Sequence, residues 1–121
     1  MSRDARPRHR DDTADLLVRT GLPKNVARAL VFLITREETT SVEVEKATGL
    51  RQPEVSIAMQ ELRRRKWVEK RDLKKEGKGR PVHSYRLAAS FGDIVETISK
   101  EERRKIEEIQ GTLRRLKRRA A

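Results

Sequence analysis

The stretch that decides the fold is SVEVEKATGLRQPEVSIAMQELRRRKW, residues 41–67. Thr40 lies three residues before Glu43, which is the spacing of a capping box at the start of a helix. Gly49 follows as the left-handed residue expected after a helix C-terminus. Pro53 then stands at the start of a second helix, where its missing N–H costs nothing. Two short helices joined by a tight turn predict a helix-turn-helix.

The second helix, expected over Gln52–Arg65, has a narrow apolar stripe. Val55, Met59 and Leu62 are spaced four and three apart, so they share one buried face. Most of the helix surface is therefore free to contact a partner. Ile57 is an apolar residue on this outer surface, and it can contact thymine methyl groups. Glutamine can pair with adenine. The residues expected to read DNA bases are Gln52, Ser56, Ile57 and Gln60.

Two strands around a glycine-containing loop follow the second helix. Residues 67–73 and 81–87 alternate enough to predict a β-hairpin, and the loop between them is KKEGKGR. Helix, helix and hairpin is the order of a winged helix. Cations on the wing and around the second helix would suit DNA phosphates. The expected backbone contacts are Ser41, Arg51, Arg63, Arg64, Lys74, Lys75, Lys78 and Arg80.

The segments before the helix-turn-helix complete one small domain. Residues 1–12 are arginine-rich without apolar periodicity and predict a disordered basic tail. A short helix is expected from Asp12 or Thr13 to Thr20. Residues 23–36 are apolar nearly all round at their centre, which predicts a buried helix. A strand of one or two residues is expected at residues 39–41.

The C-terminal segment, residues 90–121, predicts a long amphipathic helix with a possible break, since a second capping box begins at Ser99. Its apolar residues recur at spacings of three and four, as in a two-heptad coiled-coil seam. Such a seam either pairs across a two-fold axis of a homodimer or folds back on the first helix of the same chain. The residues expected to dimerise are Phe91, Ile94, Ile98, Ile106, Ile109, Leu113 and Leu116.

Composition narrows the class of function. Thirty Lys and Arg against 19 Asp and Glu give a formal net charge of +11, which argues for a polyanionic partner. The absence of cysteine excludes disulfides and thiol-based metal sensing. His9 and His83 lack metal-ligand spacing, so no metal or cofactor is expected. No apolar run is long enough to span a bilayer. We expect a cytoplasmic, nucleoid-associated protein, and no catalytic motif points to an enzyme.

Residues 40–71 resemble the core of winged helix-turn-helix transcription regulators of the archaeal TrmB, MarR and ArsR types. The resemblance rests on a helix ending T-G-L at Thr48, Gly49 and Leu50, and on V-S at Val55 and Ser56. The wing sequence GRPVHSYRL, residues 79–87, is similar to the family's G-R-P-x-x-x-Y-x-L pattern. Glu54 departs from the usual basic or polar residues of the reading face. The ArsR-type cysteines are absent.

The sequence thus predicts a mainly α fold of α+β character. We expect a winged helix-turn-helix over residues 13–89, with a two-stranded β-wing and a C-terminal helical dimerisation segment. The resemblance implies a homodimeric regulator that binds a specific double-stranded DNA site, with an unknown effector. Two alternatives remain. One is a winged-helix module that binds proteins of transcription or replication, and the other is a non-specific chromatin or nucleic-acid-binding protein.

Overall fold

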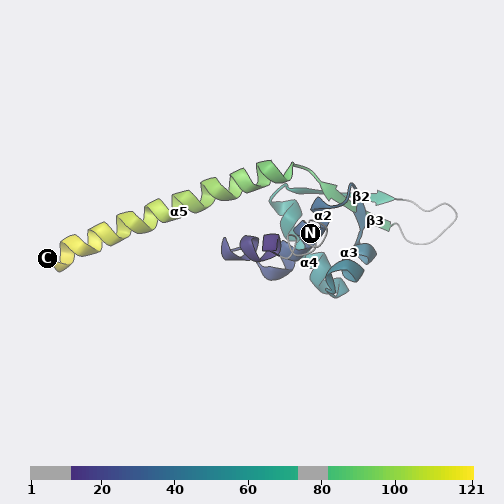
Figure 1. Cartoon of the computed structure of the whole chain (residues 1–121), viewed down its shortest axis with the longest axis horizontal. Helices are drawn as coiled ribbons and strands as arrows, with labels where there is room; N and C mark the ends of the chain where they lie inside the picture. Colours follow the sequence, from purple (N-terminus) through teal and green to yellow (C-terminus); the bar gives the residue numbers. More distant parts are fainter. Residues whose placement is uncertain (1–11, 74–81) are drawn as a thin grey trace, which may run out of the picture. The chain divides into compact units, whose positions relative to one another are not determined.

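The computed structural model describes residues 12–73 and 82–121, which fall into two compact units that divide between Ser90 and Phe91. The first unit holds four helices and a small sheet, and the second is one long helix (Figure 1). After a helix at residues 12–19, the elements of the first unit are α2 (Lys24–Ile34), β1 (Thr39–Thr40), α3 (Ser41–Thr48), α4 (Gln52–Arg64), β2 (Val68–Leu73) and β3 (Val82–Leu87). This arrangement confirms the predicted winged helix-turn-helix.

Helix α2 is the buried centre of the first unit, as its apolar composition predicts. Six of its residues are buried, and Ala27, Ala29, Leu30 and Leu33 have no exposed surface. It packs against both helices of the helix-turn-helix and against β3. The predicted first position, Pro23, is the N-cap, with extended backbone. A core of this kind fixes the position of α4, because α4 lies directly on α2.

The start of α3 is held by the predicted capping box. The Glu43 N–H donates to Thr40 Oγ1 at 3.3 Å, and the Thr40 N–H donates to Glu43 Oε1 at 2.9 Å. The buried Thr39 hydroxyl also donates to the Glu43 carboxylate, and these bonds lower the pKa of Glu43. Gly49 ends the helix with φ 79°, in the left-handed region where glycine is favoured. The turn between α3 and α4 therefore follows from local sequence.

The C-terminal end of α4 is capped by a different hydrogen-bonding motif. The Trp67 N–H donates to the Leu62 carbonyl and the Lys66 N–H to the Arg63 carbonyl, which together form a Schellman motif. Lys66 takes the left-handed position that glycine usually fills, with φ 67°. This turn directs Trp67 into the core, where it is buried, and Arg65 lies 5.0 Å from the centre of its ring. Strand β2 starts at the next residue.

The sheet has three strands, not only the predicted two-stranded wing. Its order is β1-β3-β2, and both pairings are antiparallel. The short strand at Thr39–Thr40, expected from the sequence, pairs with Tyr85 and Ser84 of β3. Lys70 of β2 lies opposite Tyr85 on the other side. Because β1 leads directly into α3, the sheet ties the wing strands to the helix-turn-helix.

The second unit is α5 (Phe91–Ala120), a continuous helix of 30 residues. The second capping box at Ser99 starts neither a new helix nor a break. The reason is that Ser99 lies among residues that continue the same apolar periodicity, and serine costs little inside a helix already formed on both sides. The loop cations predicted for the wing, Lys74, Lys75, Lys78 and Arg80, and the basic tail over residues 1–11 lie outside the described residues.

Candidate nucleic-acid interface

Helix α4 has one buried face and a broad exposed face. Val55, Ala58, Met59 and Leu62 are buried, as the sequence stripe predicts. All four predicted base-reading residues lie outside this face. Gln52 and Gln60 are exposed, Ser56 is half-buried, and Ile57 is 65% exposed. At 3.6 residues per turn, Gln52 and Ser56 lie beside Met59, whereas Ile57 lies farther round the helix.

The acidic residues of α4 are held on its other flank. Glu54 Oε1 accepts a hydrogen bond from the Arg51 N–H at 2.8 Å, so this carboxylate satisfies the helix N-terminus. Glu61 accepts from Arg64 and from Arg65, and these bonds lower the pKa of Glu61 to about 2. The departure noted at Glu54 is thus accounted for by helix capping. The carboxylates leave the flank of Gln52 and Ser56 free of negative charge.

The cations predicted to contact phosphates differ in exposure and in whether they already form an ion pair within the chain. Arg64 is exposed but forms a two-pronged ion pair with Glu61. Arg51 and Arg63 are exposed and form no ion pair within the described residues. Ser41 is half-buried at the first position of α3. Arg63 is therefore better placed than Arg64 to take a phosphate.

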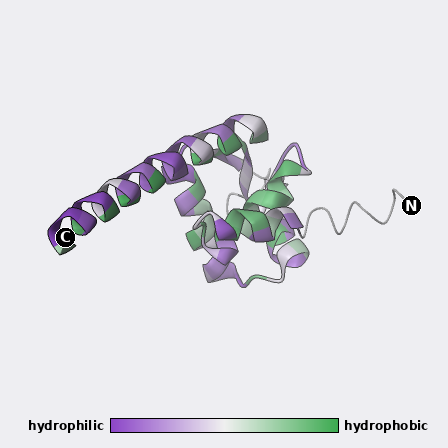
Figure 2. Cartoon of the chain, turned by 60° about the vertical axis from the view of Figure 1, so that its left-hand side comes forward, coloured by the Kyte–Doolittle hydropathy of each residue, from purple (hydrophilic) through white to green (hydrophobic). Residues whose placement is uncertain are grey.

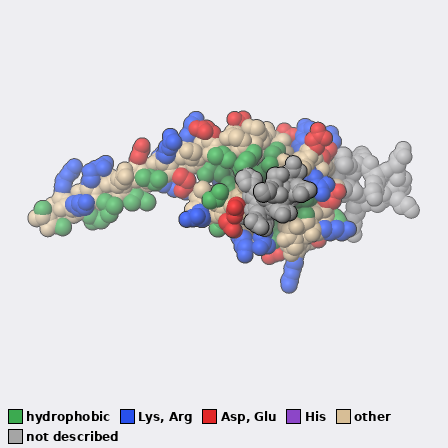
Figure 3. All heavy atoms as spheres, viewed as in Figure 1, with side chains coloured by type: hydrophobic (Ala, Val, Ile, Leu, Met, Phe, Trp, Pro, Cys, Tyr) green, Lys and Arg blue, Asp and Glu red, His purple; other side chains and the backbone are tan. Residues whose placement is uncertain are grey.

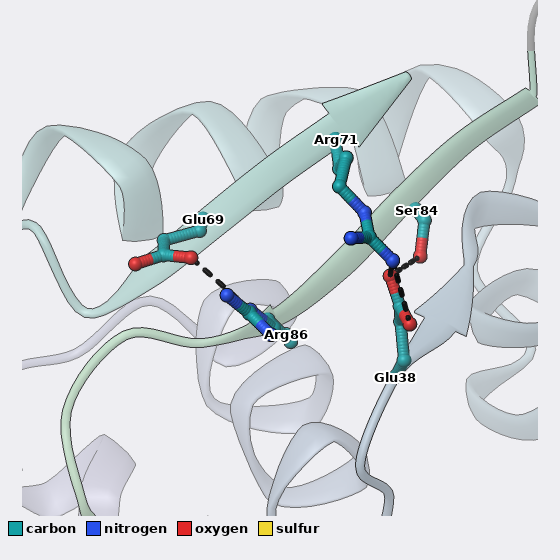
Figure 4. Close-up of polar contacts among 5 residues, drawn as sticks. All are labelled: Glu38, Glu69, Arg71, Ser84 and Arg86. Carbon is teal, nitrogen blue, oxygen red and sulfur yellow. Dashed lines mark hydrogen bonds and ion pairs between the residues drawn. The ribbon is translucent and has the colours of Figure 1, made fainter. Parts of the chain in front are cut away.

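A polar network joins β2 and β3 to the residue that precedes β1. The buried Ser84 of β3 donates its hydroxyl to Glu38 Oε2 at 2.6 Å, and Arg71 of β2 donates to the same carboxylate at 3.0 Å (Figure 4). The hydrogen bond from Ser84, followed by the charge of Arg71, lowers the pKa of Glu38. Glu69 and Arg86 form a second cross-strand pair at 3.1 Å. These contacts hold the wing strands to the segment that enters α3.

A pocket with a volume of about 160 Å³ lies where α4 faces the wing strands. Its walls combine predicted base-reading and backbone residues with residues of β2 and β3. None of the lining residues is acidic. They are Ser41, Gln52, Val55, Ser56, Met59, Gln60, Arg63, Lys70, His83 and Tyr85. Three of the four predicted base readers thus come together here, and Ile57 does not join them.

Lys70, His83 and Tyr85 are not among the DNA contacts predicted from the sequence. Lys70 forms no ion pair within the described residues, and His83 Nδ1 lies 2.8 Å from Asp72 Oδ1. Tyr85 is buried. The signal that was available is the strand alternation, which puts residues 83 and 85 on one face of β3. The register that sets Lys70 opposite Tyr85 could not be predicted, because it depends on a long loop.

The predicted dimerisation residues fall into two groups along α5. Ile94 and Ile98 are buried and Phe91 is half-buried. The four later residues are about half exposed: Ile106 54%, Ile109 60%, Leu113 49% and Leu116 57%. Hydrophobic residues recur along the helix (Figure 2) and gather along one edge of it (Figure 3). The exposed stripe is thus the part of the seam left for another surface.

The part of the chain that the structure describes holds no group of His, Cys, Asp and Glu side chains able to bind a metal. Within the same residues, no helix has the length and apolarity required to cross a membrane.

Residues 13–79 match the model of the MarR family. The chain belongs to the MarR family. The match covers more than half of the 121 residues and includes the whole helix-turn-helix. MarR-family proteins are DNA-binding transcriptional regulators, so that is the class of this protein, and its relatives are regulators and not enzymes. No curated protein matches the chain.

Solved structures with the same fold include other DNA-binding proteins. TrmBL2, an archaeal chromatin protein described with a novel mode of DNA binding, has a TM-score of 0.66 and 18% identity over 91% of this chain. The matched region is 40% of the TrmBL2 chain. A possible transcriptional regulator from Methanosarcina mazei Go1 has a TM-score of 0.61 and 13% identity, covering 77% of each chain. NadR in complex with 4-hydroxyphenylacetate has a TM-score of 0.54 and 17% identity, covering 91% of this chain and 76% of NadR. At these identities the likeness concerns the fold.

Proposed function

We propose that this MarR-family protein is a homodimer that binds a specific double-stranded DNA site in the cytoplasm, with α4 in the major groove. The proposal rests on the observation that α4 has its carboxylates on one flank and neutral polar side chains on the other. Its carboxylates accept hydrogen bonds from the Arg51 backbone N–H and from the Arg64 and Arg65 side chains, while Gln52 and Gln60 are exposed on a flank that also carries unpaired cations. Specific binding needs this combination, since cations hold the backbone and uncharged groups read base edges.

The outer side of α4 supplies groups for direct reading of base edges. Gln52 and Gln60 can each bind adenine through two hydrogen bonds, and Ile57 offers an apolar contact to a thymine methyl group. Ser56 can donate or accept. Arg51 at the start of the helix and Arg63 near its end would contact the backbone on either side of the read bases. The wing cations, which include Lys74 and Lys78, would extend those contacts along the DNA.

Dimerisation is proposed from the exposed stripe on α5. Ile106, Ile109, Leu113 and Leu116 form an apolar surface on a helix that is otherwise highly charged. A second copy of the chain would bury this stripe across a two-fold axis. Two copies of α4 could then reach half-sites one helical turn apart, about 34 Å. The binding site would consequently be palindromic.

The experiment is a binding titration of the full chain followed by in vitro selection. Fluorescence anisotropy with mixed-sequence duplexes should show binding at 50 mM salt that weakens by about 10³ or more at 200 mM, if six to ten phosphates are contacted. Selection and sequencing of bound duplexes should then give a palindromic motif. Absence of salt-dependent binding would favour the protein-interaction alternative, and binding without any selected motif would favour a chromatin role.

A further inference from the structure

The pocket between α4 and the wing strands has a chemistry that base reading does not use. It is lined by Arg63, Lys70 and His83, which offer only nitrogen donors when charged, and by no acidic residue. Arg63 and Lys70 form no ion pair within the described residues. Two unpaired cations that line one concave surface give it a positive potential, which attracts anions. The pocket is therefore suited to a negatively charged group.

Tyr85 adds a hydroxyl to this pocket. The ring of Tyr85 is buried, but its hydroxyl is not enclosed, because every fully buried side-chain polar atom within the described residues has a hydrogen-bond partner and none is found for this hydroxyl. Burial raises the pKa of the phenol, an effect that the charge of Arg63 opposes, so the hydroxyl stays protonated and can donate a hydrogen bond. The hydroxyl therefore faces the pocket, where it can donate to an acceptor oxygen of a ligand.

The size of the pocket and its apolar floor further restrict the kind of ligand that it can bind. Its volume of about 160 Å³ exceeds by roughly tenfold the ~15 Å³ that one water molecule requires, which leaves room for a tetrahedral anion. Val55 and Met59 are buried and form an apolar floor, and low polarity strengthens the attraction between the cations and an anion. His83 is oriented by Asp72 through Nδ1, which leaves Nε2 as its other polar atom.

We propose that this pocket binds a phosphate group through Arg63, Lys70, His83 and Tyr85. In the DNA complex, which rests on the function proposed above, it holds one phosphodiester of the backbone. In the absence of DNA, a free phosphate or phosphate monoester occupies the same pocket and competes with DNA. Lys70, His83 and Tyr85 are thus residues that set the position of α4 in the groove without reading sequence.

The DNA arm of the test uses conservative variants of the full chain. Lys70→Gln should weaken binding about tenfold or more for every duplex, since it removes a charged hydrogen bond. It should also reduce the slope of log affinity against log salt by about 0.9, the value for one phosphate contact. Tyr85→Phe, which removes one oxygen atom, should weaken binding by about two- to tenfold without changing sequence preference. Lys24→Gln on α2 is the matched control, because it removes the same charge outside this pocket.

The test with free phosphate follows the NMR signals of Tyr85, which is the only tyrosine of the chain. Its ring gives one set of aromatic proton resonances, which can be followed by NMR while inorganic phosphate is added at constant ionic strength. The resonances should shift saturably in the wild type and in Lys24→Gln. They should not shift in Lys70→Gln or Arg63→Gln. Unfolding curves from the single buried tryptophan, Trp67, will verify that each variant is folded.

The outcomes separate this inference from the proposed function. If Lys70→Gln and Tyr85→Phe bind all duplexes as Lys24→Gln does, and phosphate leaves the tyrosine resonances unchanged, the phosphate site is refuted while DNA binding stands. A uniform loss of DNA affinity without a phosphate shift supports the site for a DNA phosphodiester and refutes its occupation by free phosphate. If the wild type binds no duplex, the proposed function fails, and a saturable phosphate shift would still support the pocket as a site for free phosphate.

Discussion

Truncation of Ile109 and Leu113 to alanine should weaken the proposed dimer strongly. Full burial of an Ile or Leu side chain is worth about 1.5–3 kcal/mol. These two residues are 60% and 49% exposed, so a partner chain would bury the remaining half. Alanine retains part of that area, so each truncation should cost roughly 0.5–1 kcal/mol. Four truncated residues in a dimer give roughly 2–4 kcal/mol, or about 30- to 1,000-fold in the dimer dissociation constant.

Sedimentation equilibrium over a range of protein concentrations measures this constant directly. Alanine is the best helix former, so the double variant should keep α5 helical by circular dichroism. Ile57→Ala is the matched control, because Ile57 is 65% exposed and lies on α4. A wild type that stays monomeric at all concentrations would rule out the dimer. An equal weakening of the dimer by Ile57→Ala would count against a role for the α5 stripe. So would a dimer dissociation constant that changes by less than threefold in the double variant.

Three further predictions concern stability and sequence reading. Thr40→Ala removes the hydroxyl that accepts from the Glu43 N–H, and urea unfolding should show a loss of about 1 kcal/mol that Thr40→Ser largely avoids. Glu38→Gln should lower the unfolding midpoint at pH 7, because the pKa of Glu38 is lowered in the folded state and its charge therefore stabilises above the ordinary value of 4.5. The two midpoints should converge as the pH falls below that value, and parallel curves across the range would contradict the assignment. Gln60→Ala should cost about 1–3 kcal/mol on the selected duplex and almost nothing on a random one, and an equal loss on both would identify Gln60 as a backbone contact.

The sequence predicted the helix-turn-helix closely because the local signals agree with the packing. The capping box at Thr40, the turn at Gly49 and the stripe through Val55, Met59 and Leu62 are each short-range patterns. Each depends on residues within one or two helical turns. The structure places α4 within one residue of its expected end. The end of α4 was not foreseen in detail, since nothing marks Lys66 as the residue that takes a left-handed conformation.

The polar contacts of the sheet and the pocket could not be read from the sequence. Glu38 and Ser84 are 46 residues apart, and their hydrogen bond exists because β1 and β3 pair in one particular register. Lys70 and Tyr85 meet for the same reason. A register set by a loop has no local signature. The sequence could therefore indicate that the wing region is basic but not which strand residues converge with α4.

The central claim is that α4 reads a specific DNA sequence. The most direct test compares the dissociation constants of the full chain for a duplex obtained by selection and for a random duplex of the same length, at the same near-physiological salt. If α4 reads a specific sequence, the ratio should be about 10³ or more and the selected motif should be palindromic. A ratio near one, with both duplexes bound, would contradict this claim.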